Sequence, residues 1–276
     1  MKKTQKSLAE NVILVSFLLW TKLCNAAGIY NGTSTIIGEY PSQVCLKYIR
    51  SNGQSTQLCG GTILSDLYVL TSCHCFEKSV DRAHPTEFIV AGDARWDVEG
   101  RSMQRQQRSI ETLIFHPGCD SAGVQYVDLA VCKVNESFIF TKSVVEWIPL
   151  AEVKPSLGTR CSIVGWGVDE TKRKSIALKK ADAITTNFYK CGSFYTDEEK
   201  FICAASPNGI QSPCYGDCGG PLICDNKLVG ILEGGYGICG NQMYGNYYTN
   251  LANYVNWIKN VTEWTPSNFR WKQIKN

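Results

Sequence analysis

The sequence predicts an all-β protein. Short apolar or alternating stretches recur along the chain, separated by Gly, Asn, Asp, Ser and Pro, which is the pattern of strands joined by turns. One segment near the C-terminus has a helical period instead. The 276 residues are 44% hydrophobic and 19% charged, a composition that excludes fibrous, collagen-like and disordered classes.

Residues 1–28 are typical of a secretory signal peptide, with room for a short pro-segment. Lys2, Lys3 and Lys6 precede the apolar run Val12–Trp20, and small residues follow it. The run is about half of the roughly 20 residues that cross a bilayer, so no membrane span is expected. Fourteen cysteines in a chain of this length indicate an oxidising compartment. We therefore expect a secreted, extracellular protein.

The formal charge of +3 belongs to this leader. Residues 1–28 contain four lysines and one glutamate, and without them 24 basic and 24 acidic residues remain. A neutral chain has no long-range field that would attract nucleic acid or anionic lipid, so neither is expected as a partner. The basic runs 172–174 and 179–180 are interpreted as solvated loops or strand edges.

The expected elements follow from the local patterns. Strands are expected at Gln43–Tyr48, Gly61–Leu70, Glu87–Ala91, Leu129–Val134, Cys161–Trp166, Pro221–Cys224 and Lys227–Leu232. A helix is expected at Leu251–Trp264, where apolar residues return at helical spacing. No low-complexity linker or short repeat divides the chain.

Three strings carry chemistry, and together they supply His74, Asp128 and Cys218 in that order. They are CGGTILSDLYVLTSCHCF from Cys59, VDLAVCKV from Val127 and CYGDCGGPLIC from Cys214. A thiol or hydroxyl nucleophile needs an imidazole to take its proton, and the imidazole needs a carboxylate to fix its tautomer. The glycines around Cys218 allow a tight turn, so the N–H groups of Gly216 and Cys218 can point at one developing oxyanion.

On these motifs the chain resembles the trypsin/chymotrypsin family of secreted serine proteases, from Ile29 to about Lys259. IYNGTSTIIGEYPSQVCL, CGGTIL, TSCHC, DLAV, CSIVGWG, FICAA, GDCGGP, LVGI and NYVNWI carry the resemblance. It implies a chymotrypsin-like fold of two six-stranded antiparallel β-barrels, residues 29–146 and 147–276, the second followed by a C-terminal helix and tail. The active site would lie in the cleft between them, with His74, Asp128 and Cys218 at the triad positions.

The resemblance also implies disulfides. The family's bridges correspond here to Cys59–Cys75, Cys161–Cys224, Cys191–Cys203 and Cys214–Cys239. With Cys24 in the leader, five cysteines remain: Cys45, Cys73, Cys119, Cys132 and Cys218. Because five is odd, at least one thiol of a monomer stays unpaired, and Cys218 is the first candidate.

A zinc site is the alternative reading of Cys59, Cys73, His74 and Cys75. Adjacent ligands in Cys-His-Cys order lack the spacing of structural zinc sites, so we expect no metal and no other cofactor. His84 and His116 lie outside the motifs and are expected at the surface.

The sequence departs from the active pattern first at the nucleophile, where Cys218 stands in place of the family's serine. Sulfur is larger than oxygen, and a misplacement near 1 Å can lose on the order of a hundredfold in rate. Viral cysteine proteases of the same fold do use Gly-x-Cys-Gly-Gly.

Two further departures lie near the nucleophile. Glu233 replaces a serine that supports the catalytic carboxylate, and a second carboxylate beside Asp128 would repel it. Gly234 replaces a tryptophan that walls the substrate cleft.

Activation is the next departure. In the family, cleavage after Arg or Lys frees the amine of the first Ile, which pairs with the Asp before the nucleophile. Ile29 and Asp217 are present, but Ala26-Ala27-Gly28 precedes the cut. A glycosylation sequon at Asn31 lies within the segment that must insert, and a glycan there would prevent insertion for steric reasons. Asn135 and Asn260 begin two further sequons.

The specificity pocket also differs from that of trypsin-like members. The resemblance places Ser212, Glu233, Gly234 and Gly235 around it, and Ser212 stands where those members carry an Asp that attracts Lys or Arg. Any bound side chain should therefore be apolar. Tyr215 and residues 237–239 and 244–246 are candidates for narrowing or filling the pocket.

These departures favour a secreted protease homologue that has lost proteolysis and binds other proteins. The alternatives are an active endopeptidase that uses Cys218 and prefers apolar residues, and an artificial Ser-to-Cys change in an active enzyme. Within the family the chain most resembles the group 3 mite allergens and the inactivated paralogues of the scabies mite. That resemblance implies the gut lumen as location and host complement proteins as partners.

Overall fold

The structure is a computed structural model that describes residues 29–50, 52–77, 87–97, 102–120, 126–192, 197–235, 239–240 and 243–262. The signal-peptide prediction for residues 1–28 and the surface prediction for His84 fall outside these residues. Within them, no helix is long and apolar enough to cross a membrane.

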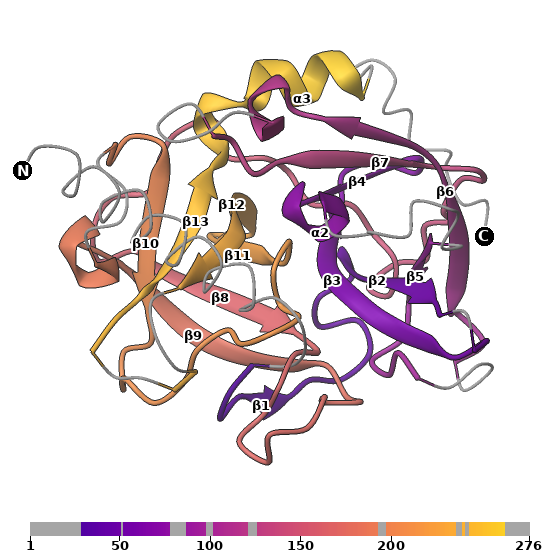
Figure 1. Cartoon of the computed structure of the whole chain (residues 1–276), viewed down its shortest axis with the longest axis horizontal. Helices are drawn as coiled ribbons and strands as arrows, with labels where there is room; N and C mark the ends of the chain where they lie inside the picture. The colour runs from indigo at the N-terminus through magenta and orange to yellow at the C-terminus, as the bar shows by residue number, and fades with distance from the viewer. Residues whose placement is uncertain are drawn as a thin grey trace, which may run out of the picture.

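Six antiparallel strands close the first barrel, which Figure 1 shows on the right. They are β2 (Gln43–Ile49), β3 (Ser55–Ile63), β4 (Tyr68–Thr71), β5 (Glu87–Ala91), β6 (Gln106–Phe115) and β7 (Ala130–Val134), paired in the order β2-β3-β4-β7-β6-β5. Strand β5 returns to pair with β2, which completes the ring.

The second barrel also has six strands, β8 (Arg160–Gly165), β9 (Lys179–Thr186), β10 (Phe201–Ala205), β11 (Pro221–Cys224), β12 (Lys227–Gly235) and β13 (Asn246–Asn250). Their ring order is β8-β9-β10-β13-β12-β11, closed by the pairing of β11 with β8. The short strand β1 (Thr33–Ser34) pairs with β9 outside the ring. The protein is therefore a pair of six-stranded antiparallel barrels, the architecture expected from the resemblance.

Apolar side chains join the two barrels as well as filling them. One buried cluster combines Leu70 and Leu129 of the first barrel with Leu228 and Ile231 of the second and with Ile258 of the C-terminal helix. Each fully buried Leu or Ile side chain contributes about 1.5–3 kcal/mol, so this shared cluster fixes how the barrels and the helix sit together. The predicted boundary after residue 146 falls in the connection between β7 and β8.

The helical elements are short: α2 (His74–Glu77), η1 (Pro117–Asp120), η3 (Phe188–Cys191), η4 (Leu251–Asn253) and α3 (Val255–Val261). The helix predicted from Leu251 starts as a 3₁₀ turn and becomes α-helical only at Val255. The side chain of Asn250 accepts the N–H of Ala252 and caps that first turn. Tyr254, with φ −118°, separates the two pieces.

The strand predictions were wrong in one place and incomplete in others. The stretch Gly61–Leu70 is the end of β3, a turn and the start of β4, because Leu64 and Ser65 both donate to the carbonyl of Tyr68. Strand β6 was missed because polar residues interrupt its alternation, with a register shift between Ile110 and Thr112.

Candidate functional site

His74 and Asp128 form the pair expected of a general base and its orienting carboxylate. His74 opens α2, and Asp128 comes two residues before β7. The ring Nδ1 of His74 is hydrogen-bonded to Asp128 Oδ2, and Asp128 Oδ1 accepts the backbone N–H of His74 at 2.9 Å. The Asp128 side chain is fully buried and that of His74 is 20% exposed. Two contacts from one buried carboxylate fix both the ring and the backbone that carries it.

Cys218 lies in the turn between residues 214 and 220, and only 3% of it is exposed. Its sulfur is 3.7 Å from the backbone carbonyl oxygen of Glu233, and its own carbonyl accepts the N–H of Gly60 at 2.9 Å. The expectation that Cys218 is the spare thiol of the chain without residues 1–28 stays a prediction.

Cys45 and Cys132 are free thiols among the described residues. Both lie on barrel strands and are fully buried. Burial disfavours a thiolate, so it raises the pKa of Cys45 to about 12 and also raises the pKa of Cys132. Neither thiol is therefore a candidate nucleophile.

All four disulfides implied by the resemblance are present: Cys59–Cys75, Cys161–Cys224, Cys191–Cys203 and Cys214–Cys239. A fifth joins Cys73, beside His74, to Cys119 in η1. Cys59, Cys73 and Cys75 are thus all oxidised, and a disulfide sulfur cannot serve as the thiolate ligand that a zinc site needs. These bonds exclude the zinc alternative.

The turn before Cys218 is held by contacts from several directions. The carboxylate of Asp217 is buried and accepts the N–H groups of Cys214 and Gly167, both at 2.9 Å. Burial raises the pKa of Asp217 to about 8, although the two backbone hydrogen bonds lower it. From strand β3 of the other barrel, the side-chain amide of Gln57 donates to the carbonyl of Gly216 at 3.0 Å. Gly216 has φ +99°, a backbone conformation that favours glycine.

Gln57 was not found from the sequence. A single glutamine on an alternating strand carries no motif, and only the closure of the two barrels brings it to Gly216. The Asp217 carboxylate also explains why position 165 of the GWG motif is a glycine. A Cβ on Gly165 would lie 2.0 Å from Asp217 Oδ1.

The N-terminal segment is docked in the second barrel. Ile29 is 1% exposed and packs in the apolar cluster of that barrel. Tyr30 donates to the carbonyl of Ser212 at 2.8 Å, and Ser212 donates back to Tyr30 at 3.3 Å. The segment that carries Ile29 is therefore hydrogen-bonded to the residue expected at the base of the specificity pocket.

The predicted pocket residues are engaged with one another and with β13. The Ser212 hydroxyl accepts the N–H of Gly240 at 2.7 Å. Glu233 is 3% exposed, and its carboxylate accepts the hydroxyl of Thr249 at 3.5 Å. Gly234 pairs with Tyr247, and Gly235 pairs with Asn246. A Cβ on Gly235 would lie 2.2 Å from Asn246 Oδ1, so the Asn246 side chain occupies the space beside Gly235.

Comparison with known proteins identifies this arrangement. A family model described as Trypsin matches residues 29–258. The chain belongs to the trypsin family.

Relatives of this trypsin-family chain include a trypsin and a phenoloxidase-activating factor. Trypsin beta of Drosophila erecta is 31% identical over 84% of the chain and 87% of the relative. Phenoloxidase-activating factor 3 of Holotrichia diomphalia is 29% identical over 84% of the chain and 71% of the relative. The solved structure of neuropsin, a serine protease of mouse brain, superposes with a TM-score of 0.72 at 27% identity, covering 84% of this chain and 99% of that one.

His116 of this trypsin-family chain, expected at the surface, is only partly exposed. Its ring lies edge-on to the rings of Tyr254 and Trp257, with centroids 5.2 and 4.9 Å away. Its Nδ1 accepts the N–H of Gly118 at 3.0 Å. Burial lowers the pKa of His116. Trp257 lies on α3 and Tyr254 directly precedes that helix, so the C-terminal helix creates this environment, which no motif around His116 indicates.

The basic runs are only partly solvated. Lys179 has a largely buried side chain that pairs with Asp169 and Glu170, both at 3.2 Å. Lys174 donates to Thr56 at 2.9 Å. The acidic turn at 169–170 and the neighbouring strand β3 supply these partners, whereas Lys172 and Arg173 are exposed as expected.

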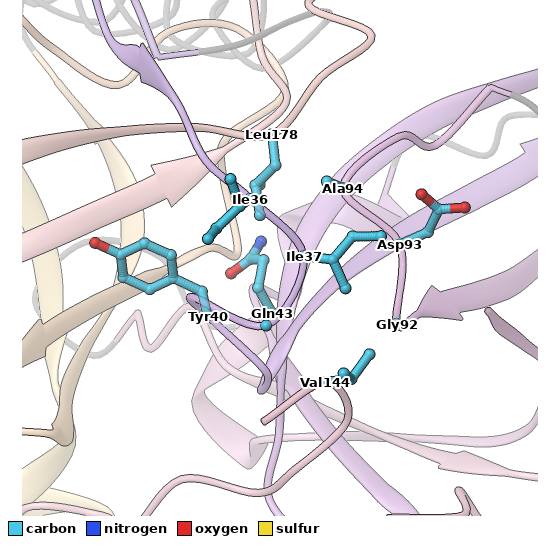
Figure 2. Close-up of a pocket in the computed structure, with 10 residues that line it drawn as sticks. Ile36, Ile37, Tyr40, Gln43, Gly92, Asp93, Ala94, Val144 and Leu178 are labelled. Atoms are coloured by element: carbon cyan, nitrogen blue, oxygen red, sulfur yellow. The ribbon is translucent and has the colours of Figure 1, made fainter. Parts of the chain in front are cut away.

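A separate hollow of the trypsin-family fold contains none of the predicted site residues. Figure 2 shows it between Ile36, Ile37 and Tyr40, which lie in the segment between β1 and β2, and Ala94, Val144 and Leu178 around them. The side-chain oxygen of Gln43 is buried in its wall without a hydrogen-bond partner among the described residues. One donor, such as a water molecule, would satisfy that oxygen.

Proposed function

We propose that this trypsin-family protein is a secreted homologue that has lost proteolysis and acts by binding other proteins. The observation that carries the proposal is the cysteine at the nucleophile's position, Cys218, which is only 3% exposed. Its sulfur is larger than the oxygen of the family's serine, and a misplacement near 1 Å can lose on the order of a hundredfold in rate. The retained His74–Asp128 pair then serves a displaced nucleophile.

The surroundings of Cys218 support the same proposal. Glu233 puts a buried carboxylate on the strand next to the nucleophile turn, where the family resemblance places a serine. Asn246 occupies space beside Gly235, at the predicted specificity pocket. Both changes work against the recognition of a peptide substrate, and neither compensates for the larger sulfur atom.

The second candidate function is an endopeptidase that uses Cys218 as its nucleophile and prefers apolar residues. The intact hydrogen bond between His74 and Asp128 favours it, because that pair could draw a proton from a thiol. Ser212 in place of an acidic residue accounts for the apolar preference. This function requires a thiol at Cys218 that His74 can deprotonate.

The proposal also includes the binding partner and the place of action. The resemblance to inactivated mite proteases supports host complement proteins as partners and the gut lumen as the place of action. Affinity capture from host serum, with the denatured protein as control, should enrich complement components. If no complement component is enriched, complement is not the partner. That result would not contradict the proposed loss of proteolysis.

Loss of proteolysis is tested with purified protein whose first residue is Ile29. It is incubated with a broad peptide library with and without reductant, beside the matched variant His74→Ala. We expect no cleavage above that of His74→Ala under either condition. Cleavage that His74→Ala abolishes would contradict the proposal, and if it requires reductant it would establish the thiol endopeptidase.

A further inference from the structure

Asn31 is the most heavily bonded residue of the docked segment, which we define as residues 29–32. Its side-chain Nδ2 donates to the carbonyl of Ile210 at 3.1 Å, and its carbonyl accepts the Gln211 side chain at 3.1 Å. Its backbone N–H donates to Glu170 Oε2 at 3.1 Å. With φ +53° it also turns the chain in the left-handed region. Both backbone groups and the side chain of Asn31 are therefore used in docking.

Two of these bonds attach the docked segment to Ile210 and Gln211. The pair of backbone bonds between Tyr30 and Ser212 continues the same contact. Ser212 in turn accepts the N–H of Gly240, and the Tyr30 ring lies so close that a Cβ on Gly240 would fall 2.4 Å from it. The conformation of the predicted pocket residues is thus coupled to the docking of Asn31.

The same Asn31 begins the sequon Asn31-Gly32-Thr33. We propose that glycosylation of Asn31 is a conformational switch: the unmodified residue docks residues 29–32 onto residues 210–212, and the glycosylated residue releases both segments. The inference does not depend on whether Cys218 reacts.

The modification acts on the atom that docking uses. Nδ2 of Asn31 attacks C1 of the first sugar of an oligosaccharide linked to a lipid diphosphate. The C1–N bond forms, the C1–O bond to the diphosphate breaks, the lipid diphosphate leaves with the electron pair, and Nδ2 loses one proton. The bulky sugar then projects from the nitrogen that is 3.1 Å from the Ile210 carbonyl. Because Asn31 is only partly exposed, the sugar and the surrounding segments compete for the same space.

The chain contains two other sequons that serve as internal controls. Asn135 is exposed, and its side-chain oxygen accepts the N–H of Ser109. A sugar is attached to the side-chain nitrogen of Asn135, so this hydrogen bond stays in place. Asn260 is exposed on α3. Glycans at these two positions should leave the docked segment unchanged.

The test uses the full chain secreted from a glycosylating eukaryotic cell. Thr33→Ala removes the sequon and keeps Asn31, whereas Thr33→Ser keeps both; Thr33 is exposed in β1, so both variants should fold. Mass spectrometry measures the occupancy of all three sequons. Hydrogen exchange then compares the amides of Tyr30 and Ser212 between protein glycosylated at Asn31 and the Thr33→Ala variant.

We expect the two amides to exchange at least about tenfold faster in the glycosylated wild type and Thr33→Ser than in Thr33→Ala, the effect of losing one or two net hydrogen bonds. Amides of β7, remote from the switch, should exchange equally in all three. Equal protection of Tyr30 and Ser212 in the glycosylated protein and in Thr33→Ala would overturn the proposal. Absence of sugar at Asn31 in the wild type would overturn it too.

Discussion

Asn246 places its side-chain oxygen directly against Gly235, its register partner on the neighbouring strand. The pair lies where β12 meets β13, and a Cβ on Gly235 would come within 2.2 Å of Asn246 Oδ1. Gly235 is one of the residues that the family resemblance places in the specificity pocket. The contact therefore connects a single residue of β13 to the proposed loss of substrate binding.

This contact predicts strong coupling between the two positions. Gly235→Ala should destabilise the protein by about 1–3 kcal/mol, because the added methyl group must displace the Asn246 side chain. In an Asn246→Ala background the same change should cost less than about 0.5 kcal/mol. Urea unfolding of the four proteins of the double-mutant cycle measures both values. Strictly additive costs would show that Asn246 does not fill this space.

The burial of His116 predicts a loss of stability at acidic pH. Its pKa is lower in the folded protein than its ordinary value of 6.5, so the unfolded chain binds the proton more readily. The stability that the neutral ring contributes is present above pH 6.5 and is lost as the pH falls below it. Denaturant midpoints between pH 7.5 and pH 5 should therefore fall further for the wild type than for His116→Gln. Parallel profiles of the two proteins would contradict this role.

Asp217 predicts a pH dependence of opposite sign that depends on the N-terminus. Its folded pKa of about 8 is raised above the unfolded value of 3.8, so its favourable contribution is present below pH 3.8 and is lost as the pH rises through 8. A chain that begins at Gly28 should lose up to about 1.4 kcal/mol per pH unit over this range. A chain that begins at Ile29 should lose much less, since the resemblance places its amine beside Asp217. Equal losses would show that the amine does not pair with Asp217.

The bridge between Cys73 and Cys119 predicts a large stability cost on removal. It closes a loop with a sequence separation of 46 residues, for which loop-closure entropy gives about 4 kcal/mol. Cys73→Ala with Cys119→Ala should therefore lower the unfolding free energy by about that amount. Cys45→Ala with Cys132→Ala removes two buried sulfur atoms without breaking a bond and should cost about 1 kcal/mol per site. Similar costs for the two double variants would contradict the prediction.

The sequence was informative where a residue sits inside a local motif. His74, Asp128 and the four implied disulfides lie in short strings whose order is characteristic of the family, and the structure brings the members of each pair together. Short apolar strands, such as β5 and β11, were placed with their observed bounds. Local pattern and tertiary structure agree at these positions.

The sequence was uninformative where distant segments meet. Gln57 reaches Gly216 across the interface of the barrels, and Asn246 meets Gly235 only through a bulged register between β12 and β13. The partial burial of His116 was not foreseen, because Tyr254 and Trp257, which lie against its ring, are more than a hundred residues away in the sequence. Burial of this kind is a property of the closed fold, and no single-residue pattern encodes it.

The most direct measurement of the central claim is restoration of the family's residues. Turnover of an apolar peptide ester is compared among the wild type, Cys218→Ser, and Cys218→Ser combined with Glu233→Ser and Gly234→Trp, all beginning at Ile29. The account predicts no turnover for the wild type or for Cys218→Ser, because the nucleophile is only one of several altered positions. The triple variant should turn the ester over, and His74→Ala should abolish that turnover. Full turnover by Cys218→Ser alone would contradict it and would indicate an otherwise intact enzyme in which a serine had been replaced.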